Sequence, residues 1–499
     1  MSGTPPGGPA APARAAAGTE GRPGARALVG GFGWETGALA AALLVQLCYT
    51  AYTGRHVSAE HFGAYAIALN LVHVCASTMV GFTQLVLKSR ELTEEFLGLA
   101  LLTAAVAGVG SCALLQLAAP VCGVLWPDVP ELVAFVRVLL LQNAVFPLSF
   151  VCASALRRSG RNRAAAVLEF GGQCTGFAAA VLLLTTGWNP LGIAVTLSVS
   201  AVVQTVGGLA LLRPRLGGLR WGGAALGGEL WLCTRSAVLQ SVMYGVPMWT
   251  AGLTLGPAVT GHYSRAVYFA SMAPMMLVQG LGRVVTPAVA RCVAAGRSPL
   301  PALGAALSAA SALLACVLGV LAALGPTVLV VLLGPGWEEA GALVPWFLPG
   351  LGLQVLCMLG NQGDEARGEH AGVWRDQLLV AGVMVAGCLV GGVLASPHVL
   401  GLAHLAATLA GHAGQLRRWG MGLMWRTYGV HGLLGVWVSA CTAAAAVGGP
   451  GLRLVSGCLG ALLALLPLCL APVGHRIPAL RTAWERGLPV PRVGGRSAP

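Results

Sequence analysis

The chain alternates between long apolar runs and short polar stretches. Runs of about 18 or more mostly apolar residues recur about fourteen times, and each is long enough to cross the ~30 Å hydrocarbon core of a bilayer as a helix. We place these spans near residues 30–53, 62–82, 96–118, 131–155, 165–186, 190–212, 231–254, 262–284, 302–324, 341–361, 377–396, 399–416, 431–448 and 452–473. The pattern predicts an all-α polytopic membrane protein with about 14 transmembrane helices.

Composition supports this prediction and excludes several chemistries. Of the 499 residues 56% are apolar and 9% are charged, whereas about a quarter of the residues of soluble domains are charged. A soluble enzyme is therefore excluded. Lys88 is the single lysine and follows no glycine-rich run, so the chain has no phosphate-binding P-loop. The 14 cysteines never form a Cys-x-x-Cys pair, and we expect no metal site and no cofactor.

The arginines predict the topology. With the N-terminus placed in the cytoplasm, 25 of the 30 basic residues fall in cytoplasmic loops and tails, and only Arg55 and Arg453 fall in outer loops. Because Arg and Lys accumulate on the cytoplasmic side, we expect a multi-pass protein of the cell membrane with both termini in the cytoplasm. The basic residues are spread over eight segments rather than gathered on one face, so nucleic acid is not an expected partner.

Short matches between the two halves indicate an internal repeat. Gly-Ala-Tyr at residues 63–65 opens the second predicted span, and Gly-His-Tyr at residues 261–263 opens the eighth. The order and spacing of such matches predict two pseudo-symmetric six-helix bundles followed by two further helices. The expected organisation is a cytoplasmic tail (1–29), a first bundle (30–212), a linker (213–230), a second bundle (231–416), an extra helix pair (417–474) and a second tail (475–499).

Four segments carry a family resemblance: His-Phe-Gly-Ala-Tyr-Ala at 61–66, Gly-His-Tyr-Ser-Arg-Ala at 261–266, Gly-Arg-Val-Val-Thr-Pro-Ala-Val-Ala-Arg at 282–291 and Leu-Gly-Pro-Gly-Trp-Glu-Glu-Ala at 333–340. With them the chain resembles the multidrug/oligosaccharidyl-lipid/polysaccharide (MOP) exporter superfamily, and within it the bacterial polysaccharide-biosynthesis flippases. The resemblance implies two bundles around a central cavity, alternating access and a lipid-linked oligosaccharide as substrate. Membrane lipids, a polysaccharide polymerase and glycosyltransferases are the expected partners of a chain that acts as a monomer.

Three arginines fall inside predicted spans, where a charge is costly. Arg137 and Arg265 both lie in the outer half of a span, where a guanidinium either forks onto substrate phosphate oxygens or extends to the lipid headgroups. The amides of Gln142, Asn143 and Gln240 either line a hydrated, substrate-binding cavity or bond between helices. We predict these five residues as the substrate-binding set.

The third arginine suggests a gate. Arg235 and Glu35 occupy equivalent positions, 200 residues apart, near the cytoplasmic ends of the seventh and first spans. We predict that the two side chains meet when the inner mouth closes; the alternative is that each reaches cytoplasmic water by itself. Glu169, beside the arginines of residues 157–163, is expected to form a local ion pair.

Two other functions remain open at this stage. A cation-coupled multidrug exporter of the same superfamily would need a carboxylate buried in the first bundle, and Glu35 is the candidate there. A membrane-embedded glycosyltransferase or polymerase would be expected to have large outer loops rich in carboxylates, whereas the predicted outer loops are short. No set of nucleophile and base is recognisable, so the favoured prediction is a transporter rather than an enzyme.

Overall fold

The computed structural model describes residues 25–77, 81–83, 86, 92–214, 223–420, 451 and 455, and within these residues it contains helices and no strand. The predicted all-helical membrane fold is confirmed. The helices are α1 (Ala25–His56), α2 (Ala59–Ala76), α4 (Glu94–Leu125), α5 (Leu132–Arg158), α6 (Asn162–Thr185), α7 (Gly192–Leu212), α8 (Gly223–Thr254), α9 (Pro257–Ala294), α10 (Leu300–Leu333), α11 (Glu338–Ala366), α12 (His370–Val393) and α13 (Pro397–Trp419).

These helices correspond in order to the first twelve predicted spans, and most extend beyond them by several residues at one or both ends. By length and composition, eight of the described helices qualify as membrane spans. Apart from residue 455, the last two predicted spans, at 431–448 and 452–473, lie outside the described residues, as do the C-terminal tail and most of the N-terminal one.

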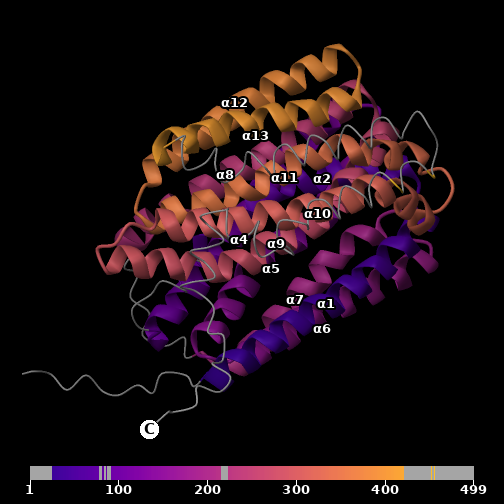
Figure 1. Ribbon diagram of the computed structural model, residues 1–499. Coiled ribbons are helices and arrows are strands. Elements are labelled where there is room, and N and C mark those ends of the chain that lie inside the picture. Colours follow the sequence, from indigo (N-terminus) through magenta and orange to yellow (C-terminus); the bar gives the residue numbers. More distant parts are fainter. Residues whose placement is uncertain are drawn as a thin grey trace, which may run out of the picture.

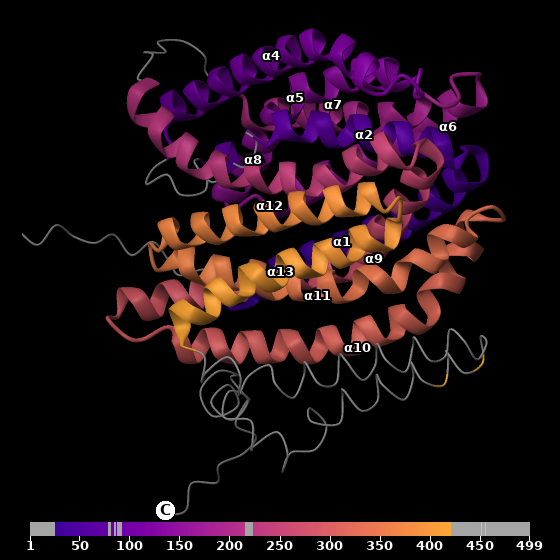
Figure 2. The same cartoon turned by 90° about the horizontal axis from the view of Figure 1, so that it is seen from above.

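Each half of the chain packs its helices in the same way. In the first half, α4 contacts α5, α5 contacts α7, and α6 contacts both α7 and α1. In the second half, the corresponding pairs are α10 with α11, α11 with α13, and α12 with both α13 and α8. We call residues 25–212 the first bundle and residues 223–419 the second bundle; Figures 1 and 2 show the long helices of the two bundles.

The repeated tyrosines occupy equivalent places in the two bundles. Tyr65 on α2 meets Phe135 on α5 edge to face, with ring centroids 5.9 Å apart. Tyr263 on α9 meets Phe347 on α11 in the same manner, at 4.9 Å. The short sequence matches thus correspond to equivalent contacts, since each tyrosine packs on the same neighbouring helix of its own bundle.

The repeated glycines meet where the two bundles cross. A Cβ atom at Gly63 would overlap the carbonyl oxygen of Pro257, and a Cβ atom at Gly261 would overlap the carbonyl oxygen of Ala59. Both positions therefore require glycine, because any larger residue would force α2 and α9 apart.

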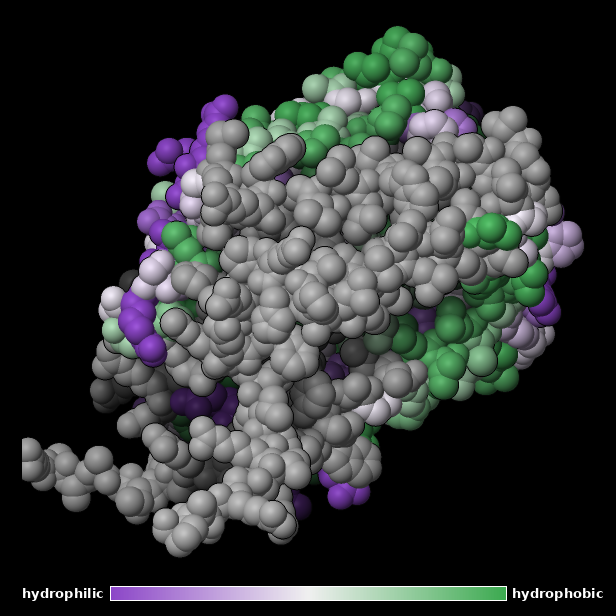
Figure 3. Space-filling model, viewed as in Figure 1, coloured by the Kyte–Doolittle hydropathy of each residue, from purple (hydrophilic) through white to green (hydrophobic). Residues whose placement is uncertain are grey.

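The outer surface of the helices is strongly apolar. Figure 3 shows hydrophobic residues gathered over α12, where Leu389, Val390 and Val393 are more than half exposed. Hydrophilic residues gather in the same view toward the end of the molecule at which α13 finishes. A water-soluble protein rarely exposes so large an apolar patch, so this surface is suited to contact with lipid tails.

Candidate functional site

The two bundles are fastened together at the end of the molecule where α2 and α9 begin. Besides the glycine crossing, the indole Nε1 of Trp337 donates a hydrogen bond of 2.9 Å to the carbonyl oxygen of Gly54. The guanidinium of Arg55 donates to the carbonyl oxygen of Val331 at 3.1 Å. We call this region, which comprises Gly54, Phe62, Gly63, Gly261, His262 and Trp337, the closed end.

Aromatic rings fill the closed end. Phe62 and His262 each meet Trp337 edge to face, with centroid separations of 5.6 and 5.4 Å. Phe62 is 2% exposed and Trp337 4% exposed. His262 in turn faces the exposed carboxylate of Glu339 at 3.6 Å. The seal is thus mainly aromatic and reaches from the interior to the molecular surface.

Arg265 lies directly beside this seal. It stands eight residues into α9, which corresponds to ~12 Å along the helix, and its guanidinium carbon lies 3.9 Å from the ring centroid of Phe62. A second ring, that of Tyr268, lies 5.5 Å away. The hydroxyls of Tyr49 and Tyr65, on α1 and α2, are within electrostatic range. Residues from both bundles therefore surround this guanidinium.

Arg265 has no ion-pair partner among the described residues: no described carboxylate lies within 4.0 Å of it. Its Nε atom is buried and makes no hydrogen bond within the described part of the chain. A guanidinium placed on an aromatic ring is stabilised through its face, while its N–H groups remain free to fork onto a carboxylate or a phosphate. The arrangement is suited to holding an anion that enters between the bundles.

A second polar region lies within the second bundle. A cavity with an empty volume of about 560 Å³ is lined by residues of α8, α11, α12 and α13, among them Gln240, Gln354, Asp376, His404 and Gln415. Its side chains bond mainly to one another: the imidazole Nε2 of His404 lies 2.9 Å from Gln354 Oε1, and Gln354 Nε2 donates to the hydroxyl of Tyr244. The predicted residue Gln240 belongs to this network, since its amide is 3.5 Å from the same hydroxyl.

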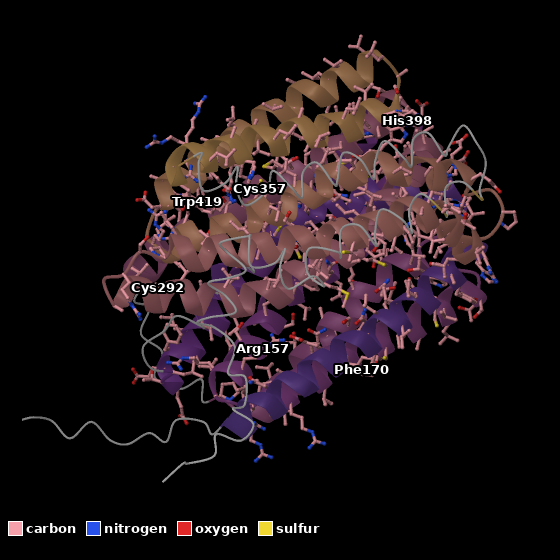
Figure 4. The ribbon with its side chains drawn as sticks, in the orientation of Figure 1. Arg157, Phe170, Cys292, Cys357, His398 and Trp419 are labelled. Carbon is pink, nitrogen blue, oxygen red and sulfur yellow. The ribbon has the colours of Figure 1, made fainter. Side chains whose placement is uncertain are left out.

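At the rim of this cavity three helices are joined by an ion cluster. Asp364, which has no exposed surface, accepts hydrogen bonds from Arg418 Nη2 at 2.7 Å and from the indole of Trp419 at 2.6 Å. Arg418 also pairs with Asp376 at 2.5 Å, and Arg367 pairs with Asp364 at 3.3 Å. Figure 4 shows Trp419 and His398 at opposite ends of the second bundle, so the ion cluster lies at the end away from His398.

The other predicted binding residues occupy different places. Arg137 is exposed on α5. Gln142 and Asn143 have no exposed surface and are buried in the first bundle, where Asn143 Nδ2 donates to Ser111 of α4 at 2.8 Å. Neither amide nitrogen nor oxygen of Gln142 has a partner within the described residues. The structure therefore does not bring these three residues together with Arg265, and their role in binding stays a prediction.

The predicted gate pair is described only in part. Arg235 lies with its guanidinium carbon 5.1 Å from the ring centroid of Trp374, on α12 of the same bundle. Glu35 is part of α1, but its side chain lies outside the described residues. The local ion pair expected for Glu169 is confirmed, because its carboxylate accepts a hydrogen bond of 2.6 Å from Arg157.

Sequence reasoning did not identify Phe62 and Trp337 as site residues, although both belong to segments that carry the family resemblance. Three of those four segments, 61–66, 261–266 and 333–340, meet at the closed end. The available signal was therefore the recurrence of glycine next to aromatic residues at the starts of spans. The sequence analysis also did not single out the ion cluster of Asp364, Asp376 and Arg418. Arg418 was counted among the cytoplasmic loop residues from which the topology was predicted.

A family model matches more than half of the chain. The model is described as "polysaccharide biosynthesis protein" and matches residues 54–342. The chain belongs to this polysaccharide biosynthesis protein family. The matched range contains every residue of the closed end and Arg265. No curated protein matches the chain in sequence.

Solved structures of low sequence identity share the fold of this polysaccharide biosynthesis protein. The lipid II flippase MurJ in an inward closed conformation has a TM-score of 0.63 at 12% identity, covering 85% of this chain and 97% of that one. A multidrug resistance MATE family transporter of the MOP superfamily, inward-facing, has a TM-score of 0.61 at 13% identity, covering 77% and 95%. An outward-facing structure of such a transporter scores 0.54 at 13% identity, covering 79% and 96%. The predicted resemblance to the MOP superfamily is thus confirmed at the level of the fold.

Proposed function

We propose that this polysaccharide biosynthesis protein moves a lipid-linked oligosaccharide across the cytoplasmic membrane by alternating access. The observation that carries the proposal is Arg265, a guanidinium that lies between the two bundles on aromatic rings and has no described carboxylate partner. A lipid-linked sugar bears phosphate groups between its lipid and its glycan, and a guanidinium recognises phosphate in a forked geometry. The family, and the fold shared with a lipid II flippase, support the same substrate class.

The proposed orientation follows from the arginines. Arg157, Arg367 and Arg418 lie at the end of the bundles away from the closed end, and cytoplasmic loops collect arginine. We therefore assign the closed end to the outer side of the cytoplasmic membrane. In this orientation the substrate enters from the cytoplasm, and its phosphates reach Arg265 below the aromatic seal.

Translocation then requires the closed end to open. Phe62 belongs to the first bundle and Trp337 to the second, so opening separates their rings and breaks the bond between Trp337 and Gly54. The glycan passes between the bundles while the lipid tail stays in the bilayer. No covalent chemistry is needed in this cycle, only binding groups and two alternately open ends. Glycosyltransferases and a polymerase are the partners proposed to make and use the substrate.

The alternative of a cation-coupled drug exporter receives less support. It requires an unneutralised carboxylate buried in a bundle, yet Asp364 and Asp376, the aspartates buried in the second bundle, both contact Arg418. In the first bundle Glu169 is paired with Arg157, and the side chain of Glu35, the candidate carboxylate there, lies outside the described residues. Arg265 itself repels cationic drugs, so its replacement affects the two candidate substrate classes in opposite directions.

The test is transport by the full chain in proteoliposomes. A fluorescent undecaprenyl-pyrophosphate-linked oligosaccharide is supplied on one side, and its movement is followed by loss of accessibility to an impermeant quencher. Arg265→Met is expected to slow transport at least about tenfold, because charged hydrogen bonds contribute roughly 1.5–3 kcal/mol. Arg417→Met, which removes an exposed arginine, is the charge-matched control. Wild-type transport by Arg265→Met, or faster export of a cationic dye, would contradict the proposal.

A further inference from the structure

Two aromatic rings hold the guanidinium of Arg265, and they differ in which bundle they belong to. Tyr268 is on α9, three residues after Arg265, so the two residues stay together when the bundles move relative to each other. Phe62 is on α2 of the first bundle and provides the closer contact, at 3.9 Å. When the bundles separate at the closed end, Arg265 keeps its contact with the ring of Tyr268 and loses its contact with the ring of Phe62.

Phe62 is held firmly in place. It is 2% exposed, and its neighbour Gly63 lies in the glycine crossing, where the backbones of α2 and α9 are in contact. Its ring also meets Trp337 edge to face at 67°. The ring therefore occupies its place over Arg265 only while the glycine crossing and the Trp337 contact are intact.

We infer that Phe62 is a positioning residue that orients the Arg265 guanidinium for phosphate, and that it makes phosphate affinity depend on closure of this end. The inference rests on the proposed function. With the end closed, the ring supports one face of the guanidinium and leaves its N–H groups in a fixed direction, so that less conformational freedom is lost when the anion binds. With the end open, the ring is withdrawn and the anion is held less tightly.

The consequence is an asymmetric cycle. The site binds phosphate more tightly when it faces the side from which substrate is loaded, and less tightly when it faces the side of release. By linkage, an anion that prefers the closed arrangement must stabilise that arrangement by the same factor. A cation–π contact of about 1 kcal/mol corresponds to a factor of about five.

Binding of farnesyl pyrophosphate to the detergent-solubilised full chain tests the inference, with farnesol as the uncharged probe. Phe62→Leu is expected to weaken farnesyl pyrophosphate binding about fivefold and to leave farnesol binding unchanged, whereas Phe62→Tyr retains wild-type affinity. In an Arg265→Met background, Phe62→Leu is expected to have no further effect. Phe135→Leu, which removes another fully buried phenylalanine in the same bundle, is the matched control.

The outcomes separate this inference from the proposed function. If Arg265→Met binds farnesyl pyrophosphate as the wild type does, the proposed phosphate site is wrong. If Arg265→Met loses binding but Phe62→Leu does not weaken it, the proposed site stands and the inference is overturned. An equal loss on Phe62→Leu with and without Arg265 assigns Phe62 a purely structural role and also overturns the inference.

A second measurement does not require the Phe62 variants to fold. Nitroxide labels on p-acetylphenylalanine at positions 128 and 338, exposed sites on the first and second bundles, report the separation across the closed end by electron–electron resonance. Farnesyl pyrophosphate is expected to raise the ratio of short to long distances about fivefold in otherwise wild-type protein. An unchanged distribution, or a shift to long distances, overturns the inference.

Discussion

Two partly buried arginines of this protein are satisfied in opposite ways. Arg418 lies within one bundle and pairs with two aspartates, one of which has no exposed surface. Arg265 lies between the bundles and has aromatic rings in place of carboxylates. A guanidinium that is already neutralised has little left to offer a ligand and serves to fasten helices. One that is held only by rings can still neutralise an incoming anion.

The ion cluster around Arg418 and the closed end beside Arg265 also differ in the strength of their contacts. The ion cluster joins α11, α12 and α13 of the same bundle through charge-assisted bonds, which are among the stronger polar contacts in proteins. The closed end joins two bundles through rings, one indole hydrogen bond and contacts between backbones. An aromatic pair or a neutral hydrogen bond contributes about 1 kcal/mol. The first region suits a fixed scaffold, and the second suits a contact that opens in every cycle of the proposed transport.

The largest expected effect comes from breaking the ion cluster. Arg418→Met leaves the carboxylate of Asp364 buried without its main partner, which is expected to cost about 3 kcal/mol or more. Thermal unfolding of the detergent-solubilised protein should show a clear drop in Tm. Arg417→Met, at the exposed neighbouring position, is the control, and equal Tm values for the two variants would show that the cluster does not stabilise the bundle.

Next in size is the effect of a methyl group at the glycine crossing. Gly261→Ala places a Cβ where the carbonyl oxygen of Ala59 now lies, so α2 and α9 must move apart at a cost of roughly 1–3 kcal/mol to the closed arrangement. Distances between labels at positions 128 and 338 should lengthen. Gly37→Ala, where no atom lies within 4 Å of the added Cβ, should leave them unchanged; lengthening in both variants would argue against a specific role of the crossing.

Trp337→Phe is expected to have a smaller effect, since it keeps a ring but removes the hydrogen bond to Gly54. The loss of one such bond is expected to shift the equilibrium of the closed end by ~1 kcal/mol, about fivefold toward opening. The same label distances measure that population. Because the contact joins two bundles, the Tm should change little; a large drop in Tm without longer distances would place Trp337 with the permanent scaffold instead.

The smallest effect on stability is expected for Arg265→Met. Its guanidinium is partly buried without an anion, and a methionine fills similar volume without desolvating a charge. We expect Tm to stay within the range of ordinary neutral substitutions, about 0.5 kcal/mol, or to rise. A loss comparable to that of Arg418→Met would contradict the distinction between the two arginines.

The order of the helices could be predicted because hydropathy alone marks a span, and the twelve helices described follow the twelve predicted segments in that range. The pairing of Arg157 with Glu169 could be predicted because the two residues are only twelve positions apart. Arg265 was singled out because a charged side chain inside a membrane span is energetically costly, and such a residue therefore indicates a functional site. Each of these inferences rests on local sequence.

The remaining features depend on contacts between distant segments. Arg418 stands at the end of a predicted span, where an arginine also serves the charge rule, and nothing local reveals that Asp364 lies beside it. Gln142 and Asn143 were predicted as lining a cavity or bonding between helices, and sequence gives no means to choose, since an amide side chain suits either place. The aromatic residues of the closed end lie in segments that carry the family resemblance. Their contact with one another depends on how the two bundles cross, which the sequence does not reveal.

The glycine crossing also bears on how such a protein can arise. Gly63 and Gly261 meet as equivalent residues do at the axis of a two-fold symmetric dimer, although both belong to one chain. In a dimer of identical halves, any residue near the axis must be present twice. Here Arg265 stands 198 residues after Ile67, the same spacing as between the two glycines, so one half carries a guanidinium where the other carries a buried isoleucine. Because both halves belong to a single polypeptide, one cation, rather than two mutually repelling ones, can stand at the centre of the proposed pathway.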